Sequence, residues 1–326
     1  MLLTLSAAIS LHAQSSLPAI TTQDPKIVRR WSLAGDPHGI ALGSDGTVYV
    51  GLAQPQAVVA IDPNTGAIKQ KVILDSAEIA ATKELVTLRM NSDRTRLYVA
   101  NGSDESATIL TLPDLHVTRE ITIEGEPIRD ALPDPKGRYL FVLGRRIHVY
   151  DAVAKNELRV LGFEEPAAIA INSTASRLAV VGNNKLSIYD ISTFEEIAHD
   201  RLDTPKALEA VLFAADDRVL LALGRDNLIE KPLLSSKRAV SQPICLPEGS
   251  GPQIAALASP GLLLFAERRC SSSGAFGGTD RAVLPASLYG VDAYAVAYDR
   301  QSNFLYTTER AGYLTIYRVP RAAIAH

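Results

Sequence analysis

A repeated two-strand unit constrains this chain more than any other feature. Its clearest copy runs from Pro37 to Val50, where an apolar strand, the turn Ser44-Asp45-Gly46 and a second β-rich strand follow one another. Seven copies align on a residue in the middle of the second strand, in steps of 38 to 49 residues: Tyr49, Tyr98, Phe141, Ala179, Leu221, Leu264 and Tyr306. A repeat of this length is typical of four-stranded propeller blades of about 40 to 50 residues.

The two ends of the repeat array complement each other. Each copy is followed by a third strand, such as 58–62, and by a more polar fourth strand, such as 67–74. The last copy has a third strand over 313–318 but no fourth, and residues 26–33 form a strand that has no copy before it. We therefore expect the N-terminal strand to complete the last blade and to close the ring.

The sequence predicts an all-β fold: a seven-bladed β-propeller with four-stranded blades. The expected boundaries are a signal peptide over 1–13, a linker over 14–25, a single propeller over 26–320 and a tail over 321–326. A closed propeller leaves no open end blade, so we expect a monomer.

Three segments resemble the YVTN-type β-propeller repeat: Tyr98-Val99-Ala100-Asn101, Tyr49-Val50-Gly51 and the Ser-Asp-Gly turn. That family is typically secreted or periplasmic and seven-bladed, and it includes surface-layer proteins, lactonases and propeller parts of haem or quinone enzymes. The resemblance covers about residues 26–318 and implies the fold, but it does not choose among these functions.

Composition and charge narrow the classes of function. Hydrophobic residues make up 47% of the 326 residues, and the net charge of −3 comes without a basic tract, which argues against nucleic-acid binding. No apolar run reaches the roughly 20 residues that span a bilayer. Residues 1–13 resemble the apolar part of a secretory signal, although no Lys or Arg precedes it. We expect a periplasmic or secreted protein, with a disordered cytosolic leader as the alternative.

Candidate site residues stand where the first strand of each copy begins, at the mouth of the expected channel. The candidates for catalysis are His38, Arg129, Asp130 and Glu209, and those for ligand binding are Gln253 and Tyr294. An arginine there could pair a carboxylate or phosphate, and a histidine could act as acid or base. Solvation of a water-filled channel is the competing interpretation.

Two cysteines and two long segments lie on the same expected face. Residues 75–84 are inserted between the first two copies, and 267–280 form a Ser/Gly-rich loop in the sixth. Cys245 and Cys270 would join across this loop as a disulfide in an exported protein, or remain two free thiols. No cysteine or histidine pattern indicates a metal or a covalent haem, so we expect no cofactor.

Three functions remain open. The preferred one is a non-enzymatic binding module whose partner, a protein, peptide or polymer, docks on the long-loop face. The second is a lactonase-like hydrolase with a small-molecule site at the channel mouth, which requires several of the four catalytic candidates to converge on one pocket. The third is a propeller subunit of a periplasmic redox complex that carries its cofactor on another chain.

Overall fold

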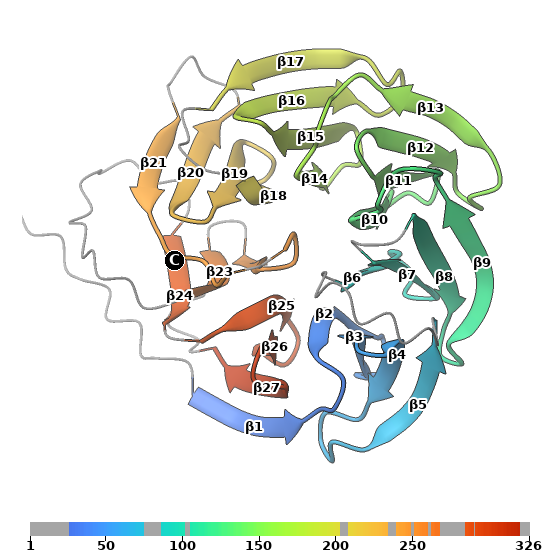
Figure 1. Cartoon of the computed structure of the whole chain (residues 1–326). Helices are drawn as coiled ribbons and strands as arrows, with labels where there is room; N and C mark the ends of the chain where they lie inside the picture. Colours follow the sequence, from blue (N-terminus) through green and yellow to red (C-terminus); the bar gives the residue numbers. More distant parts are fainter. Residues whose placement is uncertain are drawn as a thin grey trace, which may run out of the picture.

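The chain forms a ring of antiparallel sheets in a computed structural model (Figure 1). The structure describes residues 26–74, 86–101, 105–202, 208–233, 239–248, 251–259, 262–267, 284–289 and 291–319. In each four-stranded sheet the strand that comes first in the meander lies toward the centre, and the fourth lies on the circumference (Figure 1). We call the face on which the inner strands begin the upper face, and the opposite one the lower face.

Six blades have four strands each. Five of them are meanders of consecutive strands: β2 (Pro37–Leu42), β3 (Val48–Ala53), β4 (Gln56–Ile61) and β5 (Ile68–Ile73); β6 (Val86–Met90), β7 (Arg96–Asn101), β8 (Ser106–Thr111) and β9 (His116–Thr122); β10 (Asp130–Pro133), β11 (Tyr139–Leu143), β12 (Ile147–Asp151) and β13 (Glu157–Leu161); β14 (Ala168–Ile171), β15 (Arg177–Gly182), β16 (Lys185–Asp190) and β17 (Glu196–Arg201); β18 (Leu208–Ala214), β19 (Val219–Gly224), β20 (Asn227–Pro232) and β21 (Val240–Pro243). The sixth blade consists of β25 (Ala293–Asp299), β26 (Phe304–Glu309), β27 (Tyr313–Arg318) and β1 (Lys26–Ser32).

The N-terminal strand closes the ring, as the unmatched strands at the two ends of the repeat predict. β1 pairs antiparallel with β27 and so becomes the outer strand of the last blade. Arg30 donates to the buried Glu309 carboxylate at 2.6 Å, and Tyr317 donates to the same carboxylate at 3.1 Å. The Trp31 indole donates to the Pro63 carbonyl at 3.2 Å, which ties this blade to the first one.

The prediction of seven four-stranded blades is wrong. Between β21 and β25 the described residues form a three-stranded sheet of β22 (Ala255–Ser259), β23 (Leu262–Glu267) and β24 (Leu284–Tyr289). β23 pairs with β24 in parallel, whereas neighbouring strands of a meander are antiparallel. Spacing placed Leu264 in a second strand correctly, but spacing carries no information on the direction of the strand that pairs next.

Burial falls from the inner strands to the circumference. Every residue of β3 and β4 is buried or half-buried, whereas β5 is exposed along most of its length. The core therefore lies between adjacent blades, where side chains from neighbouring sheets interdigitate.

In the first four blades, the turns from the third to the fourth strand lie against these interfaces. Each has a residue with a left-handed backbone: Gly66 (φ 74°), Leu115 (φ 51°), Ala154 (φ 54°) and Phe194 (φ 59°). Leu115 and Ala154 insert into the core between their blade and the preceding one. Gly66 has no side chain to insert, and a Cβ there would lie 2.6 Å from two ring carbons of Trp31. The Trp31 ring of the closing strand β1 therefore fills the space beside this turn.

The turns on the lower face link neighbouring blades. Arg94 donates to the Gly43 carbonyl at 3.1 Å and Ser92 to the Pro135 carbonyl at 2.8 Å. Arg138 donates to the Ala175 carbonyl at 2.6 Å. These bonds explain why turn-forming polar residues recur with the repeat, because such residues stabilise their own turn and also bind the turn of a neighbouring blade.

Candidate functional site

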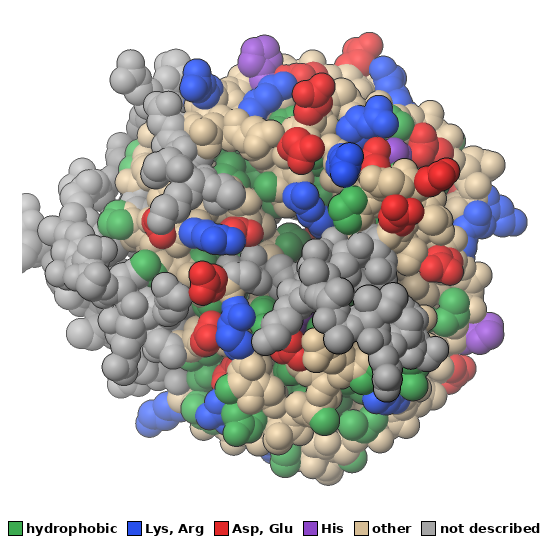
Figure 2. Space-filling view, in the orientation of Figure 1, with side chains coloured by type: hydrophobic (Ala, Val, Ile, Leu, Met, Phe, Trp, Pro, Cys, Tyr) green, Lys and Arg blue, Asp and Glu red, His purple; other side chains and the backbone are tan. Residues whose placement is uncertain are grey.

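The predicted site residues all lie at the upper face, where inner strands begin, but they belong to separate groups. Acidic and basic side chains are interspersed on the face that Figure 2 shows, around the hollow at the centre of the ring. Asp130 opens β10 and is fully buried. Arg89 of β6 holds its carboxylate with three contacts of 2.7 to 3.2 Å, and the Ala131 amide donates to it at 2.9 Å.

The Arg89–Asp130 pair joins two inner strands of adjacent blades. Burial lowers the pKa of Arg89, but the charge and hydrogen bonds of Asp130 outweigh it and raise the pKa overall. Arg89 and the Ala131 amide together make four hydrogen-bond contacts with the two oxygens of the Asp130 carboxylate. This geometry is that of a structural ion pair between blades rather than that of an acid or base open to a substrate.

His38 is completely buried in β2. Its Nδ1 accepts a hydrogen bond from the Val86 amide at 3.2 Å, so its Nε2, 3.4 Å from the Asp36 carboxylate, carries the proton. The Tyr294 ring lies against the imidazole with 4.1 Å between ring centroids, and the Arg310 guanidinium lies 4.6 Å from the centre of the Tyr294 ring. Burial, followed by the Asp36 charge, raises the pKa of Tyr294. His38 thus fixes the junction of three inner strands.

Gln253 crosses the centre of the ring. Its side chain accepts from the Leu88 amide at 2.9 Å and donates to the carbonyls of Ile40 at 2.9 Å and Leu88 at 2.7 Å. Its own carbonyl accepts from the Val296 amide at 2.8 Å. Gly39 permits this approach, because a Cβ there would lie 2.4 Å from the Val86 carbonyl oxygen and 2.8 Å from Gln253 Oε1. Gln253 is a cross-link between blades, and both N–H donors of its side chain are used in these bonds.

Glu209 and Arg129 are the predicted residues that remain most accessible. Glu209 accepts from Arg225 Nε at 3.0 Å, and its side chain is 18% exposed. Burial raises the pKa of Glu209, and the charges of Arg225 and Arg129 lower it by less. The Arg129 side chain is exposed. The upper face therefore presents two arginines around one half-buried carboxylate.

Sequence reasoning missed two polar groups. Arg89 is the one charged residue in the mostly apolar inner strand β6, and a sequence analysis could have used this as a signal. The second group surrounds the buried His148, which contacts Glu126 at 3.1 Å and Glu157 at 2.9 Å. Burial raises the pKa of Glu126, but the bonds from His148 and from the Arg146 backbone outweigh it and hold that pKa below its usual value. These partners are distant in sequence, so no local motif marks them.

Only one of the two cysteines in the predicted disulfide lies among the described residues. Cys245 lies in the connection between β21 and β22 and is disulfide-bonded. Cys270, which is the other cysteine of the chain, lies outside the described residues. Their pairing therefore stays a prediction. The long segments 75–84 and 267–280 lie outside the described residues as well, except for Glu267 at the end of β23.

Across the described ranges no group of three or more His, Cys, Asp or Glu side chains is placed to hold a metal ion. The described residues contain no helix that is long and apolar enough to cross a membrane.

The comparisons with known proteins give the class of fold. No family model matches the chain, and no curated protein matches it either, so the resemblance to the YVTN family is not confirmed. Solved structures do match. One described as "Crystal Structure of Mitotic Checkpoint Complex" aligns with a TM-score of 0.70 at 16% identity, over 98% of this chain and 99% of that one. A second, the β-propeller domain of Myceliophteria thermophila Cps50 (Swd1), aligns with a TM-score of 0.63 at 14% identity, over 91% of this chain and 100% of that one.

These neighbours and the ring of sheets together show that the protein is a β-propeller. At such low identity the likeness shows the fold alone.

Proposed function

We propose that this chain is an exported, non-enzymatic β-propeller that binds a partner protein on its upper face. The observation that carries the proposal is the state of the predicted catalytic residues. Asp130 is neutralised by Arg89, and His38 uses Nδ1 on the Val86 amide while it is completely buried. A general base must reach the proton that it abstracts, and these two side chains do not reach solvent.

The upper face nevertheless suits a protein partner. Rigid inner strands support connections of different length, and the two longest sequence insertions are expected on this face. Exposed charges of both signs surround the centre, which favours an orienting, electrostatically complementary contact over a purely apolar one. The hydrolase alternative is not proposed, because the contacts of His38, Asp130 and Glu209 form three separate groups instead of one pocket.

The experiment compares positive-to-negative charge reversals on the two opposite faces. A tagged chain is cross-linked in its own cells, a stoichiometric partner is identified, and the purified pair is measured by calorimetry. We expect the double variant Arg129→Glu/Arg145→Glu on the upper face to weaken binding at least tenfold. Lys136→Glu on the lower face, which is also exposed, serves as the matched control and should leave affinity within twofold. Equal affinity of both variants would place the partner elsewhere and refute the proposal.

Export has its own test. Amino-terminal sequencing and cell fractionation should find a mature chain that begins near Gln14 outside the cytosol, with Cys245 joined to Cys270. A cytosolic chain that retains Met1 would refute export. Hydrolysis of lactones by the purified protein, lost in Glu209→Gln, would refute the non-enzymatic assignment.

A further inference from the structure

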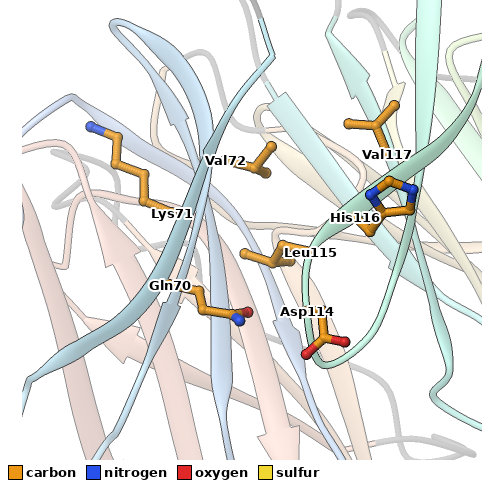
Figure 3. Close-up of a pocket in the computed structure, with 7 residues that line it drawn as sticks. All are labelled: Gln70, Lys71, Val72, Asp114, Leu115, His116 and Val117. Atoms are coloured by element: carbon orange, nitrogen blue, oxygen red, sulfur yellow. The ribbon is translucent and has the colours of Figure 1, made fainter.

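A groove lies on the circumference of the ring, away from the upper face. It has a volume of about 780 Å³ and runs between β5 of the first blade and the turn that leads into β9 of the second (Figure 3). Its lining consists of Gln70, Lys71, Val72, Asp114, Leu115, His116 and Val117. The volume is in the range of ligand-binding clefts.

The floor of the groove is apolar and rigid. Leu115 is 3% exposed and belongs to the core between the two blades, and Val72 packs partly buried against the same core. Gln70 and Val72 point from β5 toward the β9 side, whereas Lys71 points away from it (Figure 3). At two of the other third-to-fourth turns an aromatic side chain packs at the junction. Phe194 packs on Tyr139 at 5.0 Å between ring centroids, and Trp31 covers Gly66.

The edge of β5 offers backbone groups beside this floor. The Leu74 amide donates to the Gln56 carbonyl at 2.9 Å, and the register then pairs Val72 with Val58 and Lys71 with Val59. Hydrogen-bonded and non-bonded pairs alternate in an antiparallel ladder, so Val72 directs its backbone groups to β4 and Lys71 directs its own outward. β5 is the outer strand of its blade.

We propose that this groove binds an extended peptide segment of a partner protein, which adds to the edge of β5 as a further strand. The residue opposite Val72 would be apolar and cover Leu115. Its neighbour opposite Lys71 would be acidic, because directly opposed residues share a face and opposite charges stabilise the pair. The next residue, opposite Gln70, would be basic and reach the exposed Asp114 carboxylate. This pattern of apolar, acidic and basic residues is expected for the groove on the circumference. The groove is therefore a second binding site, separate from the one proposed on the upper face.

A displayed library of random heptapeptides tests the proposal on the full chain. Selection against wild type should enrich peptides with the apolar–acidic–basic pattern. With Lys71→Glu, whose side chain is exposed, the acidic position should become basic while the other two persist. Val72→Glu should weaken the best peptide at least tenfold, with its melting temperature checked against wild type. Lys155→Glu in the corresponding turn of the third blade is the control and should keep affinity within twofold.

Amide hydrogen exchange provides a second test, which distinguishes backbone pairing with β5 from contacts between side chains alone. The best peptide should slow exchange at Lys71, because its outward N–H becomes bonded. Failure to enrich any peptide that discriminates wild type from Val72→Glu would overturn the proposal, since the lysines of β5 would then only protect an edge strand. A pattern that is unchanged in Lys71→Glu, or unchanged exchange at Lys71, would also overturn it. Arg129→Glu/Arg145→Glu should leave peptide binding intact, so this proposal and the upper-face proposal fail independently.

Discussion

The buried ion pair between Arg89 and Asp130 gives the sharpest test of how adjacent blades are held together. Its shortest N–O distance is 2.7 Å, and the side chains are 22% and 0% exposed. With charge centres about 4 Å apart and an effective dielectric constant of about 20, the attraction is about 4 kcal/mol. Removal of one partner leaves a buried charge uncompensated, which costs about 3–5 kcal/mol.

The two halves of the pair should respond unequally. Arg89→Met leaves the fully buried Asp130 carboxylate with the Ala131 amide as its remaining donor among the contacts described above, so we expect a loss of about 3–5 kcal/mol in unfolding free energy. Asp130→Asn leaves a guanidinium that already reaches solvent, and the amide oxygen can still accept from Ala131. We expect about 1–3 kcal/mol there.

The double variant Arg89→Met/Asp130→Asn decides the interpretation. Replacing both charges removes the unpaired group, so its cost should be smaller than that of Arg89→Met alone, with a coupling energy of about 2–4 kcal/mol. Equilibrium unfolding in guanidinium chloride, followed by far-ultraviolet circular dichroism and the single tryptophan, measures all four proteins. Additive single costs, or single costs below about 1 kcal/mol, would refute the assignment of this pair as an inter-blade clamp.

Three further predictions concern ring closure and pH. Gly66→Ala should lower the free energy of unfolding by about 2–4 kcal/mol, because its Cβ would lie 2.6 Å from Trp31 in a left-handed backbone. Gly46→Ala is the control: its φ is 81°, nothing lies within 4 Å of the added Cβ, and we expect a loss of about 1 kcal/mol. Equal melting temperatures of the two variants would contradict this prediction. Glu126→Gln should destabilise the protein above about pH 4.5, because a carboxylate whose pKa is lowered in the folded state stabilises the fold at pH values above its unfolded-state pKa. The stability of the variant should approach that of wild type as the pH falls. A stability difference that persists unchanged into acid would contradict this prediction. Glu209→Gln should behave oppositely, because its raised folded-state pKa makes the wild type lose stability as the pH rises past the usual glutamate value. The melting temperature of the variant should therefore gain on that of wild type as the pH rises above about 4.5, and a constant gap would disprove this.

Much of the fold could be predicted from the sequence because each blade is locally encoded. Alternating strands and their turns lie close together in the chain, and all seven aligned residues, from Tyr49 to Tyr306, lie in strands that follow an inner strand. Ring closure by residues 26–32 followed from counting strands at the two ends. The irregular sheet after β21 did not follow, because parallel pairing of β23 with β24 joins segments across a long connection.

The candidate site shows the limit of sequence reasoning more clearly. Position at the start of an inner strand correctly placed His38, Asp130 and Gln253 on the upper face, since strand direction is set by the repeat. What each side chain does there depends on neighbours far away in the chain: Arg89 is 41 residues from Asp130, and Ile40 is 213 residues from Gln253. Only the tertiary structure decided that Arg89 neutralises Asp130 and that Gln253 bridges two blades. The sequence determined the repeating unit because its hydrogen bonds are local, whereas the chemistry of the ring centre is created by contacts between units that no local pattern records.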